Sequence, residues 1–175
     1  MRSFRENILL HIDAAYNLAR WLTRNEQDAK DVVQDSFLRA LKYGATFKGQ
    51  DHKPWFLKII RNTSYTLIKS QKNTHIFIPF DEDVHDLEEK RENPEDHLIR
   101  HGDVVLIRMA LESLAVEYRE VLILRELENL SYEEIAKVVD VPLGTVMSRL
   151  SRGRAQLSDL IKSTETNQGI KNENR

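Results

Sequence analysis

Apolar side chains recur every three or four positions along most of this chain, the spacing that places them on one face of an α-helix. The pattern predicts amphipathic helices over residues 7–24, 28–43, 54–72, 96–114, 118–128 and, with one break, 131–157. Because all of these segments have the helical spacing, we expect an all-α fold.

The helical periodicity stops after Lys72 and returns near Asp96. Between Asp81 and Asp103 the chain holds ten acidic residues against three basic ones, a composition that favours an extended, solvated segment. We therefore expect two small helical domains joined by an acidic linker. The predicted boundaries are 1–73 for the first domain, 74–95 for a flexible linker, 96–162 for the second domain and 163–175 for a disordered tail.

Residues 131–157 have the pattern of a helix-turn-helix. Ser131 and Glu134 have the spacing of a capping box, which begins a short helix. Pro142 disfavours helical geometry at Val141 and lacks a backbone N–H, so it suits the start of a second helix better than the interior of the first. The inward residues of that second helix are Val146, Leu150 and Leu157.

The outward face of the second helix is basic. From Gly144 to Leu157 it holds three arginines and no acidic residue, a set of donors suited to phosphates and base edges. An ordinary helical hairpin with a solvated basic face is the alternative interpretation.

The overall charge of -2 and the pI of 6.3 are not typical of a nucleic-acid-binding protein, but these averages hide the segregation of charge along the chain. Opposite charges on different segments suggest that, in the free protein, the acidic linker and the first domain fold against the basic recognition helix and lower its affinity for DNA.

Several classes of site are not supported by the sequence. The chain has no cysteine, so disulfides and thiolate metal sites are excluded, and no apolar run has the length of a signal peptide core or a membrane span. We expect a cytoplasmic protein without a cofactor. His97 and His101 are four residues apart but lack an obvious third ligand, and no nucleophile or phosphate-binding motif is present, so we expect neither a metal site nor an enzyme.

An acidic row lies on one side of the predicted helix 28–43. Asp28, Asp31 and Asp35 follow one another at spacings of three and four residues, and Leu38 continues the row. Like charges at this spacing repel one another. The row is therefore either a solvated surface or the docking face for a basic partner.

Basic and aromatic side chains are interleaved between Phe47 and Lys72. This composition is typical of a site for single-stranded nucleic acid, and also of an ordinary exposed helix. Phe47 lies in the predicted loop 44–53, where it either anchors the loop to the core or stacks on an unpaired base.

Three segments in this order resemble the extracytoplasmic-function (ECF) sigma factors of the bacterial sigma-70 family. The segments are DAKDVVQDSFLRAL, PWFLKIIRNTSYTLIK and LRELENLSYEEIAKVVDVPLGTVMSRLSRGRAQL. The resemblance covers roughly residues 5–160 and implies sigma domain two followed by sigma domain four. It also implies a transcription initiation factor that binds core RNA polymerase, recognises promoter DNA and is regulated by an anti-sigma factor.

The resemblance assigns roles in the first domain. The acidic helix would dock on the clamp helices of the largest polymerase subunit, through Asp28, Asp31, Gln34, Asp35 and Leu38. The following loop and helix would capture a flipped base of the downstream (-10) promoter element and hold the backbone nearby, through Phe47, Lys53, Lys58, Arg61, Asn62 and Lys69.

In the second domain the resemblance assigns the recognition helix to the upstream (-35) promoter element. The expected contacts are Arg125, Met147, Ser148, Arg149, Ser151, Arg152 and Arg154. Met147 departs from the basic residue of many relatives, and Ser151 is small where some relatives are aromatic. Arg149 and Arg154 have an alternative, which is to pair with acidic residues of the same domain.

Two other functions remain possible on these patterns. A stand-alone helix-turn-helix regulator would account for residues 96–160, but not for the acidic helix, aromatic loop and basic helix of residues 26–72. The second alternative is an interaction protein that keeps a sigma factor inactive. The acidic linker is the only feature that supports it.

Overall fold

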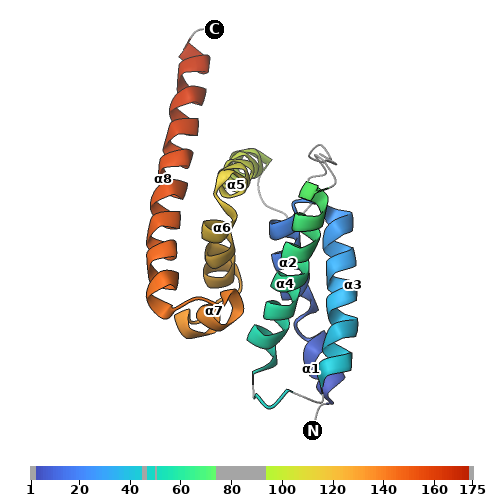
Figure 1. The fold of residues 1–175 in the computed structure, drawn as a ribbon. Helices are drawn as coiled ribbons and strands as arrows, with labels where there is room; N and C mark the ends of the chain where they lie inside the picture. The colour runs from blue at the N-terminus through green and yellow to red at the C-terminus, as the bar shows by residue number, and fades with distance from the viewer. Residues whose placement is uncertain (1–2, 45–46, 50, 74–93, 174–175) are drawn as a thin grey trace.

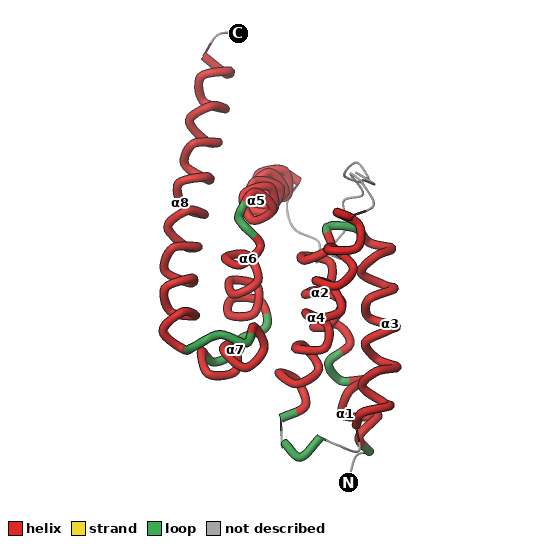
Figure 2. Tube along the Cα trace, viewed as in Figure 1, coloured by secondary structure: helices red, strands yellow, loops and turns green. Residues whose placement is uncertain are grey.

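The computed structural model describes residues 3–44, 47–49, 51–73 and 94–173, and within them the side chains at 72–73, 94–103 and 164–173 are left aside. All regular structure in the described ranges is helical (Figure 2), so the predicted all-α fold is confirmed. Of the predicted linker 74–95, residues 74–93 lie outside the described ranges, as do the side chains of His97 and His101.

The first helical group comprises four helices: α1 (Phe4–Leu9), α2 (Ile12–Thr23), α3 (Glu26–Tyr43) and α4 (His52–Asn73). The single helix predicted over 7–24 is in fact two, because the chain leaves helical geometry at His11. This break lets α1 turn so that the Phe4 ring lies 5.6 Å from the ring of Trp55 on α4. Asn25 caps α3, because its side chain accepts the Asp28 N–H at 2.9 Å.

The second helical group comprises α5 (Pro94–Ser113), α6 (Val116–Leu122), the π-helical segment η2 (Ile123–Leu127), α7 (Tyr132–Val139) and α8 (Leu143–Glu173). The helix predicted over 118–128 therefore begins earlier and ends in a wider π turn. Apolar spacing does not distinguish the two helix types here. The π turn lies at the end of the helix, so it changes the direction of only a few side chains.

The ends of the second group also differ from the prediction. α5 begins at Pro94, and α8 continues to Glu173, although we expected a disordered tail from residue 163. α8 can continue this far because no proline follows Pro142, and because each residue added to a nucleated helix forms one more backbone hydrogen bond.

The two groups pack against each other. In Figure 1, α2 and α4 lie between α3 on one side and the second group on the other, and α4 contacts α7 while α2 contacts α6 and η2. Fully buried residues of both groups, such as Phe56 and Ile60 on α4 and Ile135 on α7, belong to one continuous apolar cluster. The Arg119 guanidinium of α6 adds a hydrogen bond to the Trp21 carbonyl of α2 at 3.3 Å.

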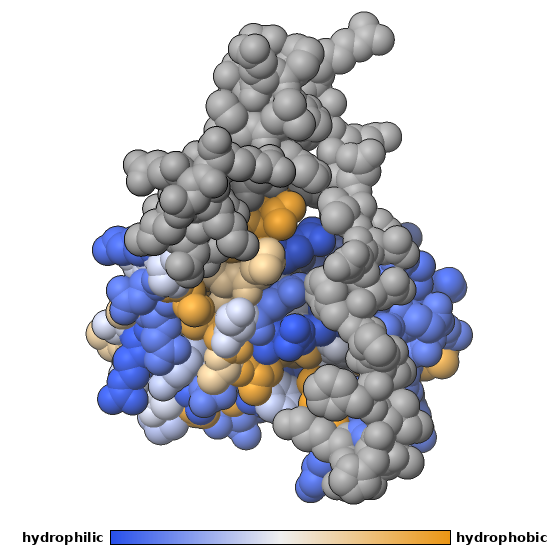
Figure 3. Space-filling view, turned by 90° about the horizontal axis from the view of Figure 1, so that it is seen from above, coloured by the Kyte–Doolittle hydropathy of each residue, from blue (hydrophilic) through white to orange (hydrophobic). Residues whose placement is uncertain are grey.

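The hydropathy of the described surface varies from one region to another. In the view from above, the described surface is mainly hydrophilic, with a band of hydrophobic residues across its middle (Figure 3). Among the helices in the described ranges, we find none with the length and apolar character that crossing a bilayer requires.

The capping box of α7 generates a stability prediction. The Ser131 hydroxyl accepts the Glu134 N–H at 3.2 Å, and the Glu134 carboxylate accepts the Ser131 N–H at 2.6 Å. We expect Ser131→Ala to lower the free energy of unfolding by about 1 kcal/mol, measured by chemical denaturation, because the N-terminal amides of α7 lose a partner.

Ser158→Ala, at an exposed position in α8, is the control and should leave the free energy of unfolding nearly unchanged. The hydrogen bond from the Ser131 N–H lowers the pKa of Glu134. The stabilisation by this carboxylate is therefore present at neutral pH and lost as the pH falls through the lowered pKa. Equal stability of Ser131→Ala and wild type would show that the box does not stabilise the fold.

Candidate functional site

Local backbone geometry builds the turn of the helix-turn-helix. Asp140 ends α7 in the left-handed conformation with φ of 58°, and its N–H donates to the Ala136 carbonyl. The Pro142 carbonyl then accepts the N–H groups of Thr145 at 2.9 Å and Val146 at 3.2 Å. α8 therefore begins directly after Pro142, so the predicted break and restart are confirmed.

α8 has a buried side and an exposed side. Val146 and Leu150 are buried, as predicted, and Leu157 is half-buried. Four of the predicted -35 residues are exposed on the opposite side, where their spacing places them on one face: Met147, Ser148, Ser151 and Arg152. This face is open to a large partner.

A glycine lets α8 approach α6 closely. A Cβ atom at Gly153 would lie 3.2 Å from Leu122 Cδ1 and 3.3 Å from Tyr118 Cβ, so a larger side chain would push the two helices apart. The close contact fixes the position of the exposed face of α8 relative to the rest of the second group.

The other three arginines predicted for this site already have partners. Arg149 lies 3.5 Å from the Glu120 carboxylate, and Arg154 forms an ion pair with Glu126 at 2.7 Å, which raises the pKa of Arg154. The Arg125 guanidinium donates to the Leu130 carbonyl at 2.7 Å and lies over the Tyr132 ring. For Arg149 and Arg154, the alternative of pairing with acidic residues of the same domain is therefore the one observed.

Phe47 is anchored in an aromatic cluster. Its ring lies 4.9 Å from the ring of Trp55, 4.8 Å from that of His52 and 6.3 Å from that of Phe4. These contacts correspond to the first of the two roles considered for Phe47, which is to hold the loop against the helices.

Three cations of α4 are paired with carboxylates of the second helical group. The pairs are Lys53–Glu128 at 3.1 Å, Lys58–Asp140 at 3.0 Å and Arg61–Glu120 at 2.8 Å. Lys53 also donates to the Glu128 backbone carbonyl at 2.8 Å. Of the residues predicted for the -10 element, Asn62 and Lys69 remain exposed on α4.

Glu120 is the most buried charge among these pairs, with a side-chain exposure of 0%. Its carboxylate accepts hydrogen bonds from Arg61 Nε at 2.8 Å, Arg61 Nη2 at 3.2 Å and the Tyr65 hydroxyl at 3.0 Å. Burial and the Glu120 charge raise the pKa of Tyr65. Burial opposes the charge of Arg61, but the hydrogen bonds to Glu120 outweigh it and raise the pKa of Arg61. We call Glu120, Arg61, Tyr65 and Arg149 the Glu120 cluster.

The polarity of these contacts is opposite to the one we expected. We expected the acidic linker and the first domain to cover the basic recognition helix. Residues 74–93 of the linker lie outside the described ranges, and within these ranges basic residues of the first group contact acidic residues of the second. The reason is orientation: Asp31 on α3 faces solvent, and the cations of α4 face α6 and α7.

The predicted acidic row lies on α3 as expected, but its members differ in exposure. Asp31, Gln34 and Leu38 are exposed, while Asp28 and Asp35 are half-buried. Hydrogen bonds and one ion pair engage the three carboxylates: Gln71 of α4 to Asp28 at 2.9 Å, Gln27 to Asp31 at 3.1 Å and Arg39 to Asp35 at 2.8 Å.

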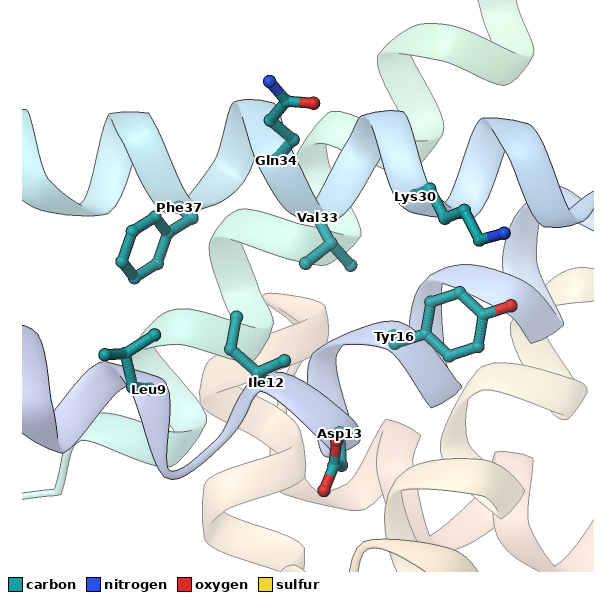
Figure 4. Close-up of a pocket in the computed structure, with 8 residues that line it drawn as sticks. All are labelled: Leu9, Ile12, Asp13, Tyr16, Lys30, Val33, Gln34 and Phe37. Atoms are coloured by element: carbon teal, nitrogen blue, oxygen red, sulfur yellow. The ribbon is translucent and has the colours of Figure 1, made fainter.

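An apolar groove runs beside this row. It has a volume of about 390 Å³ and is formed by α1, α2 and α3. Figure 4 shows Phe37 and Val33 of α3 facing Leu9 and Ile12, while Gln34 lines the edge of the groove with its amide group turned outward. The face of α3 therefore combines carboxylates with an adjoining apolar depression, which suits a partner helix that carries both basic and apolar side chains.

Sequence reasoning missed Glu120, Glu128 and Gly153. Glu120 and Glu128 are buried acidic residues within or next to an apolar run, and Gly153 is a glycine inside a strong helical pattern. Each is unusual for its position, because a buried carboxylate needs a partner and a helical glycine is costly without a packing reason. These two kinds of unusual residue could have indicated a buried ion pair and a close contact between helices.

Models of two protein families match this chain. The model described as "Sigma-70 region 2" matches residues 8–74, and the one described as "Sigma-70, region 4" matches residues 105–157. Together the two matches cover more than half of the chain and lie on the first and second helical groups.

Curated relatives agree with these matches. The chain is 35% identical over 173 residues to the ECF RNA polymerase sigma factor SigE of Mycolicibacterium smegmatis, covering 96% of this chain but only 66% of that relative. It is 32% identical to the ECF RNA polymerase sigma-E factor of Haemophilus influenzae, covering 83% of this chain and 79% of that relative.

Solved structures show the same arrangement of helices. The sigma factor RpoE of Bartonella quintana, in complex with the anti-sigma factor NepR, matches with a TM-score of 0.74 and 28% identity over 91% of this chain and 96% of that one. CnrH, in complex with the cytosolic domain of CnrY, shares the fold with a TM-score of 0.66 and 24% identity over 91% of this chain and 88% of that one. On the evidence of both family models and the curated relatives, the chain belongs to the ECF sigma factors of the sigma-70 family.

Proposed function

We propose that this chain binds core RNA polymerase and directs it to promoters, reading the -35 element as duplex DNA and melting the -10 element. The observation that carries the proposal is the presence of both sigma-70 regions, in order, on one chain. Residues 1–73 and 96–162 are the corresponding domains in this proposal, with the acidic segment between them as the linker.

A stand-alone helix-turn-helix regulator is not favoured. Such a protein has no need of the first helical group, yet residues 8–74 match sigma-70 region 2. Family members act as regulators rather than catalysts, and we assign no enzymatic role. The polymerase resides in the cytoplasm, and we propose that this chain acts there.

α8 is the proposed reader of the -35 element. Its exposed face is set by the buried side chains beneath it and by the close contact at Gly153. Arg152 is the exposed arginine of this face, and a guanidinium forms paired hydrogen bonds with guanine in the major groove. Arg149 and Arg154 contact phosphates in this proposal only after leaving their present carboxylate partners.

The loop and helix α4 are the proposed site for the -10 element. Asn62 is exposed and has both donor and acceptor groups for the edge of an extruded base, and Lys69 is exposed for the backbone. Phe47 supports the loop through its aromatic neighbours. Lys53, Lys58 and Arg61 join this site when their carboxylate partners are replaced by phosphates.

The acidic face of α3 and its groove are the proposed contact with core polymerase. The clamp helices would place basic residues against Asp28, Asp31 and Asp35 and apolar residues near Leu38. We also propose regulation by an anti-sigma factor, because the RpoE structure contains such a partner and its fold covers most of this chain.

Run-off transcription with core RNA polymerase tests the proposed function. We expect initiation that depends on the added protein at a subset of promoter fragments from the source genome. DNA binding without any dependence of initiation on this protein would instead support the stand-alone regulator.

Substitution of Arg152 tests the reading of the -35 element. We expect Arg152→Ala to lower the affinity for a bound promoter and to relax the preference at one base pair by about 1–3 kcal/mol, the range for a bidentate contact. Competition binding against a set of single-base promoter variants measures this preference.

The matched control is Lys137→Ala, which removes one positive charge from an exposed position of α7. It should weaken binding uniformly or not at all. A uniform loss for Arg152→Ala across all promoter variants would identify Arg152 as a phosphate contact rather than a base contact.

Charge reversal on α3 tests the contact with polymerase. We expect Asp31→Lys combined with Asp35→Lys to abolish co-purification with core polymerase, because a basic partner meets repulsion in place of attraction. The fold should persist, since both carboxylates lie outside the apolar core; circular dichroism and thermal unfolding measure this.

Glu133→Lys combined with Asp159→Lys makes the same change in net charge at exposed positions of α7 and α8 and is the control. It should retain core binding. If the α3 variant binds core polymerase with the affinity of wild type, the acidic row is solvated surface only.

A further inference from the structure

Contacts between the two helical groups use the cations that the proposed function assigns to DNA. Lys53, Lys58 and Arg61 all lie on α4, and each pairs with a carboxylate of the segment from α6 to the end of α7. The three pairs have the same polarity. One set of side chains cannot bind these carboxylates and DNA phosphates at the same time.

The three pairs differ in their exposure to solvent. Asp140 is 78% exposed in the Lys58–Asp140 pair, so water and salt screen this pair strongly. Glu128 is 8% exposed and Glu120 is 0% exposed, so these carboxylates depend on protein partners for their hydrogen bonds. The buried pairs therefore contribute more to holding the groups together.

Glu120 differs from Glu128 because it contacts both proposed DNA-binding helices. It accepts two hydrogen bonds from Arg61 of α4, and it lies 3.5 Å from Arg149 of α8. Tyr65 of α4 supplies a third hydrogen bond to the same carboxylate. Without α4, Glu120 would lose all three of these hydrogen bonds.

We infer that Glu120 is an autoinhibitory residue, which holds the two helical groups closed and withholds the basic face of α4 from nucleic acid until the groups separate. The inference rests on the proposed function. Phosphate oxygens are the natural competitors for Arg61, because they form the same charge-assisted, bidentate hydrogen bonds as a carboxylate. Binding of single-stranded DNA and opening of the groups are then coupled.

The exposed face of α8 is not restricted in this way. Met147, Ser148, Ser151 and Arg152 are exposed while the groups are closed. Closure therefore acts on the three paired cations of α4, and on α8 only through Arg149. Binding of duplex DNA should depend little on Glu120, and binding of single-stranded DNA should depend on it strongly.

The test compares Glu120→Gln with Glu126→Gln in the full-length chain. Both variants neutralise a carboxylate that contacts an arginine of α8, but among the described contacts only Glu120 also reaches α4. Glutamine keeps the shape of the side chain, and Arg61 and Arg149 are partly exposed, so both can be solvated. Thermal unfolding confirms that each variant is folded.

Opening is measured by energy transfer between two dyes. The chain has no cysteine, so Leu41→Cys on α3 and Ala155→Cys on α8, both exposed positions, provide unique labelling sites. DNA binding is measured by anisotropy with a 12-nucleotide single-stranded DNA of random sequence and with a random duplex. Run-off transcription with core polymerase is followed in parallel.

For Glu120→Gln we expect lower energy transfer and a gain in affinity for the single strand of about tenfold. The free energy of a hydrogen bond to a charged group corresponds to a change in affinity of about this size. Glu126→Gln should match wild type in energy transfer and in affinity for the single strand. Any gain in duplex binding should be small and similar in the two variants, because each releases one arginine of α8. Wild type should open as salt rises, and Glu120→Gln should be open already at low salt.

Three results would overturn the inference: unchanged energy transfer in Glu120→Gln, opening without a gain in affinity for the single strand, or an equal gain in both variants. Loss of run-off activity in every protein, with opening and single-strand binding as expected, would instead overturn the proposed function. The two failures are therefore distinguishable.

Discussion

α4 has to satisfy two environments at once, and the arrangement of the other helices depends on how it does so. Its apolar side, with Phe56, Leu57 and Ile60 fully buried, completes the core of the first helical group. Its basic side meets the carboxylates of the second group. The apolar side of α4 holds α2 and α3 in place. The basic side of α4 determines which surface of α6 and α7 faces the first helical group.

These two kinds of contact respond differently to a charged partner. Apolar burial in the first group is insensitive to ionic strength, whereas the ion pairs across the group boundary can be exchanged for pairs with phosphates or basic helices. The core of each group therefore persists in conditions that weaken the boundary. The inferred opening of the groups uses this difference: the ion pairs across the boundary exchange partners, while the helices of each group stay folded.

Features encoded locally were predictable from the sequence. The capping box at Ser131 and Glu134, the break at Pro142 and the acidic row on α3 each involve residues within a few positions of one another. Contacts between distant segments were not predictable in this way. Lys53 and Glu128 are separated by 75 positions, and neither the period of the apolar residues nor local composition indicates that they meet. The π turn of η2 was also missed, because periodicity cannot distinguish it from an α-helical turn.

The structure also changes the amount of positive charge that α8 can offer to DNA. The sequence places three arginines and no acidic residue between Gly144 and Leu157, but Arg149 and Arg154 have carboxylate partners from α6 and η2. Arg152 is thus the arginine of this segment without a carboxylate partner among the described contacts. Met147 and Ser151 beside it are uncharged, so the exposed face of α8 relies more on shape and hydrogen bonding than on charge. If α8 reads the -35 element as proposed, sequence preference should depend on few residues, and general affinity for phosphates on the release of Arg149 and Arg154.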